Sequence, residues 1–314
     1  MRAAGIRQFG ANVELLELPA PDSPAADEVL IRVVAAGVGN WDELVRQGSW
    51  DVGAQPPAAL GVEAAGIIDL VGRAVMGFEP GDRVLTHPLP LLGQGTWAEF
   101  LLARATLVAR APAALDWPTA AVLPVPGLTA DQAIRDALRV RADDVVLVHG
   151  AGGVTGSLAA QLAQRAGARV IVTAGPSSVD YARGLGIDAV LDGHDPVWPQ
   201  QARALTDGTG VHAALNAVRG AEAATLAAVQ DGGRFCTITG QPPLEERGVS
   251  IVNLYVAPDG PRLANVAELT AQGQFRPRMG LRLPLERAAE ALSMAASGRG
   301  GGAVALVIDA EAVL

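Results

Sequence analysis

A glycine-rich turn within residues 145–175 constrains the fold of this chain more than any other feature. An apolar run of four residues that begins at Val145 precedes it, as in a strand buried on both faces of a parallel sheet. The residues after the turn are apolar at helical spacing, and a β-branched run follows them. The turn itself contains Gly150, Gly152, Gly153 and Gly156. The pattern predicts a strand–helix–strand unit with the glycines after its first strand.

A glycine turn at the carboxyl end of a strand is suited to bind a diphosphate. Glycines let the backbone approach the ligand, and the N–H groups and dipole of the next helix attract an anion. The predicted ligands are Gly150, Gly152, Gly153, Val154, Thr155 and Gly156. The alternative is a packing turn without a ligand. Valine at Gly153 or Gly156 is expected to abolish binding in a protein that still folds, because its side chain would fill the diphosphate space.

Composition excludes several other classes of function. With 314 residues the chain is long for one hydrophobic core and fits two domains. The net charge of -9 argues against nucleic acid or an anionic membrane as a partner. No apolar run approaches a membrane span, and the first residues lack the apolar core of a secretory signal, so we expect a cytoplasmic protein. Cys236 is the only cysteine, which excludes an internal disulfide and a cysteine cluster for zinc.

Secondary-structure patterns divide the chain into three parts. Short β-type runs separated by proline and glycine fill residues 1–118, which predicts a partly open β-barrel for the catalytic or substrate domain. Residues 119–257 alternate strand and helix patterns, as in a doubly wound parallel sheet. Residues 258–314 return to the first domain. Within the middle part, residues 124–127 are expected to interrupt a helix, and Thr129 to cap the next one.

Several short motifs occur in a fixed order along almost the whole chain. They are Ala36-Gly37-Val38 with Asp42 and Gly48, residues 61–66 and 81–84, Gly127-Leu128-Thr129-Ala130, the glycine turn, Pro258-Asp259-Gly260 and the closing glycines. Together they resemble the motifs of medium-chain dehydrogenases/reductases, in the zinc-independent quinone oxidoreductase branch. The resemblance implies an α/β fold: a Rossmann doubly wound parallel sheet plus a GroES-like, partly open β-barrel domain.

Two positions distinguish the chain from the zinc-dependent alcohol dehydrogenases that it also resembles. Those enzymes carry a zinc-ligand cysteine where Gly39 stands and a zinc-ligand histidine where Val62 stands. Neither residue can bind a metal, and the four histidines are scattered without ligand spacing, so no metal site is expected. His149, beside the glycine turn, is interpreted as a packing and hydrogen-bonding residue rather than a base.

The end of the second strand indicates which nicotinamide cofactor binds. An NAD site usually has an acid there, which hydrogen-bonds the ribose 2′-hydroxyl. No carboxylate stands there in this chain to repel a 2′-phosphate, so we expect NADP(H). The predicted contacts at this end are Thr173, Ser177, Ser178 and Arg183, with helix capping as the alternative for Ser177. Further cofactor contacts are predicted at the ends of later strands, at Asn216, Thr239 and Gly240. Asn253 is added because its segment resembles one that lies near the nicotinamide in the family.

The resemblance implies hydride transfer to a quinone or an α,β-unsaturated carbonyl. Negative charge then develops on the carbonyl oxygen of the acceptor, where a hydrogen-bond donor stabilises the transition state. Candidate catalytic residues are Asn40, Trp41 and Thr129. A turn-capping role for Asn40 and a core position for Trp41 are the alternatives, and Asp42 is interpreted as a loop-bracing residue rather than an acid.

Two further functions compete with the NADPH-dependent quinone or enone reductase. An enoyl reductase acting on a carrier-bound or specialised-metabolite intermediate would share the fold and cofactor. A non-enzymatic NADPH-binding protein, like the zeta-crystallins that resemble this branch, belongs to another class. By resemblance we also expect a homodimer, because family members often pair sheet edges through a strand like residues 249–256.

Overall fold

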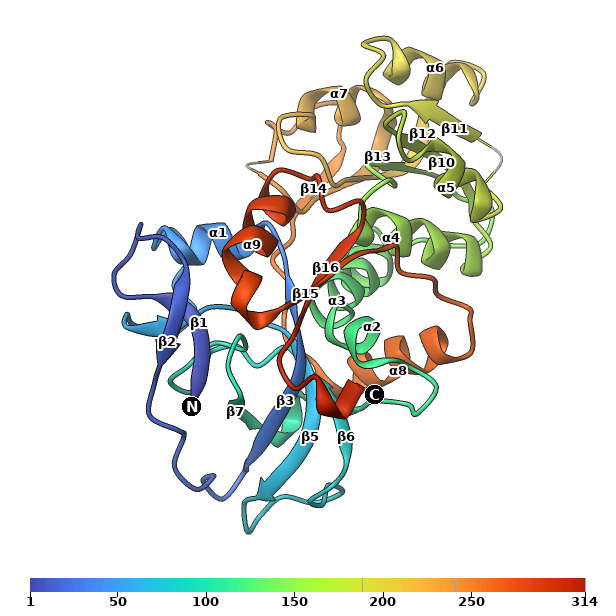
Figure 1. The fold of residues 1–314 in the computed structure, drawn as a ribbon. Coiled ribbons are helices and arrows are strands. Elements are labelled where there is room, and N and C mark those ends of the chain that lie inside the picture. The colour runs from blue at the N-terminus through green and yellow to red at the C-terminus, as the bar shows by residue number, and fades with distance from the viewer. Residues whose placement is uncertain (188, 241, 314) are drawn as a thin grey trace. The chain divides into compact units, whose positions relative to one another are not determined.

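The computed structural model describes residues 1–187, 189–240 and 242–313. The chain forms two compact units. Residues 1–128 and 258–314 form the first unit, and residues 129–257 form the second. Both ends of the chain therefore belong to the same unit, and the glycine turn belongs to the other (Figure 1). No helix in the described part of the chain has the length and apolar character needed to cross a membrane.

The second unit is built on a six-stranded parallel sheet. Its strand order is β11-β10-β9-β12-β13-β14, so the first strand in sequence lies inside the sheet and the order reverses beside it. This is the doubly wound topology that the sequence predicts. The strands are β9 (Val145–His149), β10 (Arg169–Ala174), β11 (Ala189–Asp192), β12 (Val211–Asn216), β13 (Val229–Thr237) and β14 (Ser250–Asn253).

Helices cover both faces of this sheet (Figure 1). On one face, α4 packs against β9 and β10. On the other face, Leu147, Ile171 and Phe235 of the strands form a buried cluster with Trp198 and Leu226. The helices are α4 (Val154–Arg165), α5 (Val179–Gly184), α6 (Trp198–Ala204), α7 (Glu222–Ala227) and the π-helical turn η2 (Ala133–Ala137). Trp198 and Leu226 belong to α6 and α7, so these two helices share a face.

The first unit consists of two β-sheets. The strand orders are β2-β1-β4 and β15-β16-β3-β5-β6-β8, with β7 also paired to β3. The strands are β1 (Arg2–Ile6), β2 (Glu14–Glu17), β3 (Glu28–Val38), β4 (Ala58–Ala59), β5 (Ala64–Val71), β6 (Arg83–Thr86), β7 (Phe100–Arg104), β8 (Val108–Arg110), β15 (Met279–Pro284) and β16 (Ala303–Val307).

The long strand β3 connects the two ends of the chain within this unit. One edge of β3 pairs with β5, while β7 pairs with its first half and β16 with its second half. Because β16 comes from the C-terminal segment, the unit is complete only when both ends have folded together. The helical segments are α1 (Trp41–Arg46), α2 (Trp117–Ala121), α8 (Gly260–Ala271), α9 (Ala288–Ala296), η1 (Ala105–Leu107), η3 (Leu285–Arg287) and η4 (Glu311–Val313).

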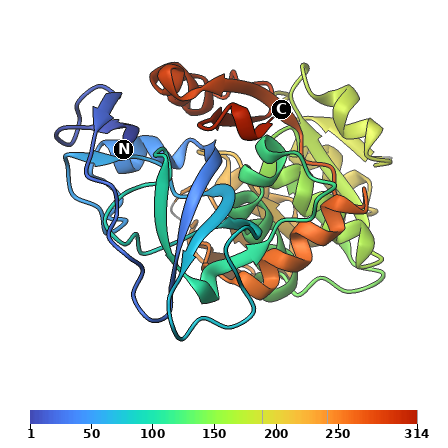
Figure 2. The same ribbon diagram turned by 60° about the horizontal axis from the view of Figure 1, so that its bottom comes forward.

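Helix α3 (Pro124–Gln132) contradicts one prediction from the sequence. Residues 124–127 do not interrupt a helix but form the first turn of α3, where a proline loses no helical hydrogen bond. Thr129 lies inside this helix, so its predicted capping role is wrong. Gly127 allows α8 to approach closely, since an added Cβ would lie 2.6 Å from Cγ1 of Val266. Figure 2 shows the same ribbon turned, with α8 in orange.

Candidate functional site

The glycine turn joins β9 to α4 and is held by Thr173 of β10. The N–H of Gly150 donates to Thr173 Oγ1 (3.0 Å), and the N–H of Ala151 donates to the Thr173 carbonyl (2.9 Å). Gly150 has φ +97°, a left-handed conformation that other residues adopt only with strain. The turn is therefore fixed at the carboxyl end of the first strand before any ligand binds.

Gly153 and Gly156 have different surroundings. Among the described residues, an added Cβ at Gly153 would find only the Gly150 carbonyl oxygen within 4 Å, at 3.5 Å. The same atom added at Gly156 would lie 2.3 Å from that oxygen. Gly156 is thus required for α4 to pack against the turn, and the expectation that a valine there leaves the fold intact is wrong. At Gly153 the space beyond the backbone is open.

The first turn of α4 supplies N–H groups to this space. Gly153 is the N-cap of the helix and has no side chain with which to cap it. The first helical hydrogen bond runs from Ser157 N–H to the Gly153 carbonyl (3.0 Å). The N–H groups of Val154, Thr155 and Gly156 come before it and find no acceptor within the helix. Such groups at a helix N-terminus are suited to bind a phosphate.

Two of the residues predicted to contact the ribose face the protein interior instead. The Thr173 hydroxyl is buried and bonds both Gly150 N–H and His149 Nδ1, the latter at 2.6 Å. The buried Ser178 hydroxyl donates to the Gly175 carbonyl (3.0 Å). Ser178 also fills the space beside Gly152, where an added Cβ would lie 2.3 Å from its Oγ. Thr173 and Ser178 therefore support the turn from inside, which corrects their predicted role.

The other two predicted ribose contacts are exposed at the surface of α5 and before it. Arg183 pairs with Asp180 one turn earlier (3.7 Å), and both side chains are exposed. Ser177 is exposed, and Ser178 rather than Ser177 occupies the N-cap position of α5.

His149 lies at the end of β9, directly before the turn. Its ring stacks on Trp198 with centroids 4.4 Å apart and planes at 14°. Burial lowers the pKa of His149 to about 4, so the ring is neutral at neutral pH. The packing and hydrogen-bonding interpretation of His149 is confirmed.

The remaining predicted cofactor residues lie at the ends of β12, β13 and β14. The amide of Asn216 is buried, and its Nδ2 donates to the hydroxyls of Thr237 (3.2 Å) and Thr239 (3.4 Å). Its Oδ1 accepts from Val218 N–H and the Thr225 hydroxyl, each at 3.3 Å. Asn216 thus fastens neighbouring strand ends, which corrects its predicted role as a direct contact. At Gly240 the side chain of Glu222 lies close, since an added Cβ would be 2.4 Å from its Oε1. The amide of Asn253 donates to the Tyr255 hydroxyl (3.3 Å).

The candidate catalytic residues of the first unit lie at the start of α1. Asn40 is exposed at the N-cap position, and its side chain makes no capping hydrogen bond, so the capping alternative is wrong. The indole of Trp41 lies against Gly39, where an added Cβ would lie 2.1 Å from Cε2. The third candidate, Thr129, is 7% exposed inside α3.

Asp42 braces the loop before α1. Its Oδ2 accepts from Gly39 N–H (2.8 Å), so the bracing interpretation is confirmed. Burial raises the pKa of Asp42 to about 8, and Glu63 is a second buried acid whose charge interacts with it. Glu63 Oε2 accepts from Val125 N–H (2.8 Å) in the first turn of α3. Burial, and then the Asp42 charge, raise the pKa of Glu63 well above its usual range.

Three buried polar atoms near these residues have no hydrogen-bond partner in the described part of the chain. They are Trp41 Nε1, Asp42 Oδ1 and His87 Nε2. His87 donates from Nδ1 to the Val62 carbonyl (2.7 Å), and burial lowers its pKa to about 4. Sequence reasoning missed Glu63 and His87. The signal for Glu63 was a single acid inside the small apolar run of residues 61–66.

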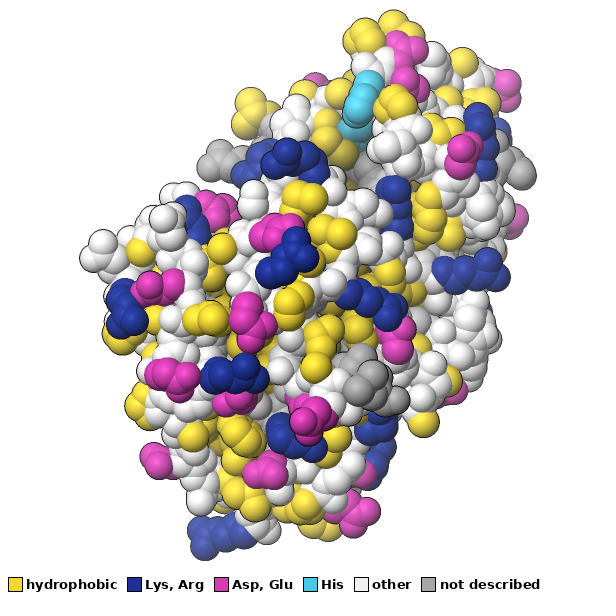
Figure 3. Space-filling view, viewed as in Figure 1, with side chains coloured by type: hydrophobic (Ala, Val, Ile, Leu, Met, Phe, Trp, Pro, Cys, Tyr) yellow, Lys and Arg dark blue, Asp and Glu magenta, His cyan; other side chains and the backbone are white. Residues whose placement is uncertain are grey.

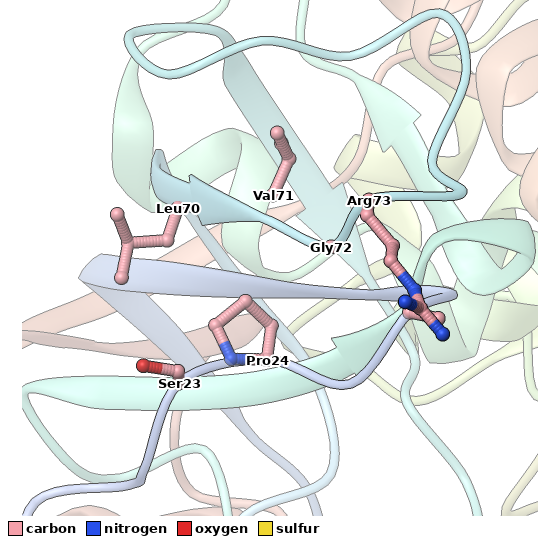
Figure 4. Close-up of a pocket in the computed structure, with 7 residues that line it drawn as sticks. Ser23, Pro24, Leu70, Val71, Gly72 and Arg73 are labelled. Atoms are coloured by element: carbon pink, nitrogen blue, oxygen red, sulfur yellow. The ribbon is translucent and has the colours of Figure 1, made fainter.

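The described residues contain no group of three or more His, Cys, Asp and Glu side chains that could hold a metal ion. A hollow of about 510 Å³ lies at the end of β5 and is lined by residues 23, 24, 26 and 70–73 (Figure 4). A second, of about 700 Å³, lies between α1 and α9. Neither contains a predicted site residue, and the first has only Arg73 as a charged side chain.

Comparison with known families gives two matching models. The alcohol dehydrogenase GroES-like domain matches residues 25–113, and the zinc-binding dehydrogenase domain matches residues 185–306. Quinone oxidoreductase from Sus scrofa is 30% identical over 282 residues, which cover 85% of this chain and 85% of that protein. The chain belongs to the medium-chain dehydrogenase/reductase family. Within it, the chain falls in the quinone oxidoreductase branch.

Membership of this oxidoreductase family confirms the predicted fold and implies a nicotinamide cofactor. A crystal structure of an NAD-dependent alcohol dehydrogenase is 31% identical, with a TM-score of 0.88 over 98% of this chain and 100% of that one. Erythronolide synthase EryA2 from Saccharopolyspora erythraea is 37% identical over 207 residues, or 64% of this chain. This chain covers only 6% of the length of that synthase.

Proposed function

We propose that the protein is an NADPH-dependent, metal-independent reductase that transfers a hydride to a quinone or an α,β-unsaturated carbonyl. The observation that carries this proposal is the open space at Gly153, beside the N–H groups of α4, at the carboxyl end of β9. A dinucleotide diphosphate fits these groups. Measuring NADPH oxidation with a panel of such acceptors tests the proposal.

The chain's own residues define how the cofactor is held. The backbone of residues 150–156 binds the diphosphate, and Thr173, Ser178 and His149 keep that backbone in place. The chain from Thr173 to Gly175 carries no carboxylate, which supports NADPH over NADH. When bound, the cofactor supplies the hydride.

The start of α1 supports metal-independent chemistry. The Trp41 indole occupies the space that a side chain at position 39 would need, and Val62 offers no ligand atom. A reductase without a Lewis acid must stabilise the developing oxyanion with hydrogen-bond donors. Asn40 is exposed, and its side chain is not used for capping, so we assign its amide this role.

Replacing Asn40 with alanine tests that assignment. We expect Asn40→Ala to lower kcat about 100-fold or more, because removal of one oxyanion donor costs about 2.7–4 kcal/mol in well-studied cases. Cofactor affinity, measured by fluorescence titration with NADPH, should stay unchanged. The exposed Gln47 at the other end of α1 provides the control variant Gln47→Ala. An unaltered kcat in Asn40→Ala would remove Asn40 from the mechanism.

Two other functions compete with this one. The chain also matches a segment of a much longer synthase, erythronolide synthase EryA2, and we keep an enoyl reductase that acts on a carrier-bound thioester as the second candidate. Such an enzyme would reduce enoyl thioesters faster than quinones. A non-enzymatic NADPH-binding protein would bind the cofactor tightly but oxidise none with any acceptor. The acceptor panel therefore separates all three functions.

We also propose that the protein is a homodimer through β14. This strand ends the strand order of the parallel sheet, and the nearby Leu244 and Tyr255 are 90% and 81% exposed. An uncovered edge of this kind favours strand pairing with a second copy. Sedimentation equilibrium should give twice the mass of 32.1 kDa. Ile251→Pro should convert the dimer to monomer by removing one edge N–H, and a wild-type monomer would refute the proposal.

A further inference from the structure

The turn after β11 brings a histidine to the end of β10. Gly193 N–H in this turn donates to the Ala174 carbonyl (3.0 Å), which ties the turn to the last residue of β10. His194 N–H donates to Asp192 Oδ1 (2.9 Å), which fixes the backbone at His194 itself. His194 therefore has a defined position although it lies in a loop.

The imidazole of His194 lies against Gly175, the residue that follows β10. A Cβ added at Gly175 would lie 3.1 Å from Nε2 and 3.3 Å from Cε1 of His194. Gly175 does not have a left-handed φ, so the imidazole rather than the backbone conformation disfavours a side chain there. In a doubly wound sheet the end of the second strand is where the ribose 2′ substituent lies. The imidazole thus lies against the residue that follows the second strand, at the end of the strand where an NAD site usually has a carboxylate.

The rest of the turn is rigid and its acids are already engaged. Asp195 accepts from Val197 N–H through Oδ1 and from Gln201 through Oδ2, each at 3.0 Å. Trp198, three residues later, stacks on His149. The His194 side chain itself is exposed and makes no hydrogen bond or ion pair within the described residues. Figure 3 shows histidine side chains at the surface of this unit.

We propose that His194 recognises the 2′-phosphate of NADPH and so sets the preference for NADPH over NADH. The proposal deepens the function proposed above and rests on it. A protonated imidazole pairs with a phosphate by a charge-assisted hydrogen bond, whereas the 2′-hydroxyl of NADH offers no charge. The charged groups on its own turn are Asp192 and Asp195, and α5, which follows β10, carries the Asp180–Arg183 pair. The only cation among them, Arg183, already has a carboxylate partner.

Fragments of the cofactor test this assignment without a hydride acceptor. The affinities of 2′,5′-ADP and 5′-AMP, measured by calorimetry at pH 6.5, differ only through the 2′-phosphate. We expect the wild-type protein to bind 2′,5′-ADP more tightly, and His194→Ala to reduce that preference about tenfold or more without changing 5′-AMP binding. His194→Arg should keep the preference. Val197→Ala is the matched control, because its 48% exposed aliphatic side chain lies on the same turn.

Each contradictory result identifies a different error. If His194→Ala keeps the full preference while Arg183→Ala loses it, the assignment to His194 is wrong and the NADPH proposal stands. Equal loss of both fragments in His194→Ala also refutes the assignment, since it would show only a distorted turn. If the wild-type protein binds the two fragments equally, the proposed preference for NADPH fails together with the role of His194.

Discussion

Gly153→Val is expected to lower NADPH affinity at least 100-fold while the protein stays folded. A factor of 100 corresponds to about 2.7 kcal/mol of binding free energy. The loss follows because the valine side chain would enter the open space beside the N–H groups of α4, where the diphosphate is proposed to bind. The fold should tolerate the change, because Gly153 has φ -85° and ψ 167°, values that valine adopts readily. Fluorescence titration with NADPH measures the affinity.

A second glycine provides the matched control for this variant. Gly184, at the end of α5, is also exposed, and an added Cβ there would meet no atom of the described residues within 4 Å, so Gly184→Val makes the same chemical change elsewhere in the unit. We expect Gly184→Val to retain NADPH binding and both variants to keep Tm within about 2–4 °C of the wild type. Unchanged affinity in a folded Gly153→Val protein would contradict the assignment of the turn.

The second large effect concerns stability and Asp42. Its pKa rises from 3.8 to about 8 on folding, so the native state holds the Asp42 proton more tightly than the unfolded chain does. Stability from this proton is therefore present at low pH and is lost as the pH rises from about 4 to about 8. His87 and His149 have the opposite sign, because their lowered pKa values favour the folded state as the pH rises to 6.5.

Between pH 6.5 and 8 these histidines no longer change protonation, so the buried acids Asp42 and Glu63, whose pKa values are both raised, can be followed without them. Between pH 6.5 and 8, the free energy of unfolding of Asp42→Asn should fall by about 2 kcal/mol less than that of the wild type. Asparagine has no proton to lose, and it still accepts from Gly39 N–H. Urea unfolding at the two pH values measures the difference. The exposed Asp69 on β5 provides the control Asp69→Asn. Equal pH dependence in the Asp42→Asn variant and the wild type would show that Asp42 is ionised in the folded protein.

The strand–helix–strand unit could be predicted because its signals are local. Apolar runs define β9 and β10, and the glycines mark the turn between them. The start of α4 at Val154, within the glycine turn, was not predictable from propensity, since valine, threonine and glycine are poor helix formers. The first turn of α3 was missed for a similar reason, because prolines are unfavourable in a helix except in its first turn.

The detailed roles of the site residues depend on tertiary contacts that a sequence does not display. A hydroxyl at the end of a strand can face the ligand or the interior, and in Thr173 it faces Gly150 and His149. His194 was missed as a site residue because the loop after β11 reaches the end of β10 only once the sheet has formed. Glu63 accepts a hydrogen bond from Val125 N–H in the first turn of α3, which is far along the chain, so the sequence does not show why an acid is buried there.

Oxidation of NADPH by the chelator-treated protein tests the central claim most directly. The decrease in NADPH absorbance is followed with naphthoquinones, ortho-quinones, enals and an enoyl thioester, before and after removal of metals with EDTA. We predict turnover with a quinone or an enone at a rate that metal removal does not change. Tight NADPH binding without turnover of any acceptor, or activity that disappears with EDTA and returns with zinc, would contradict a metal-independent reductase.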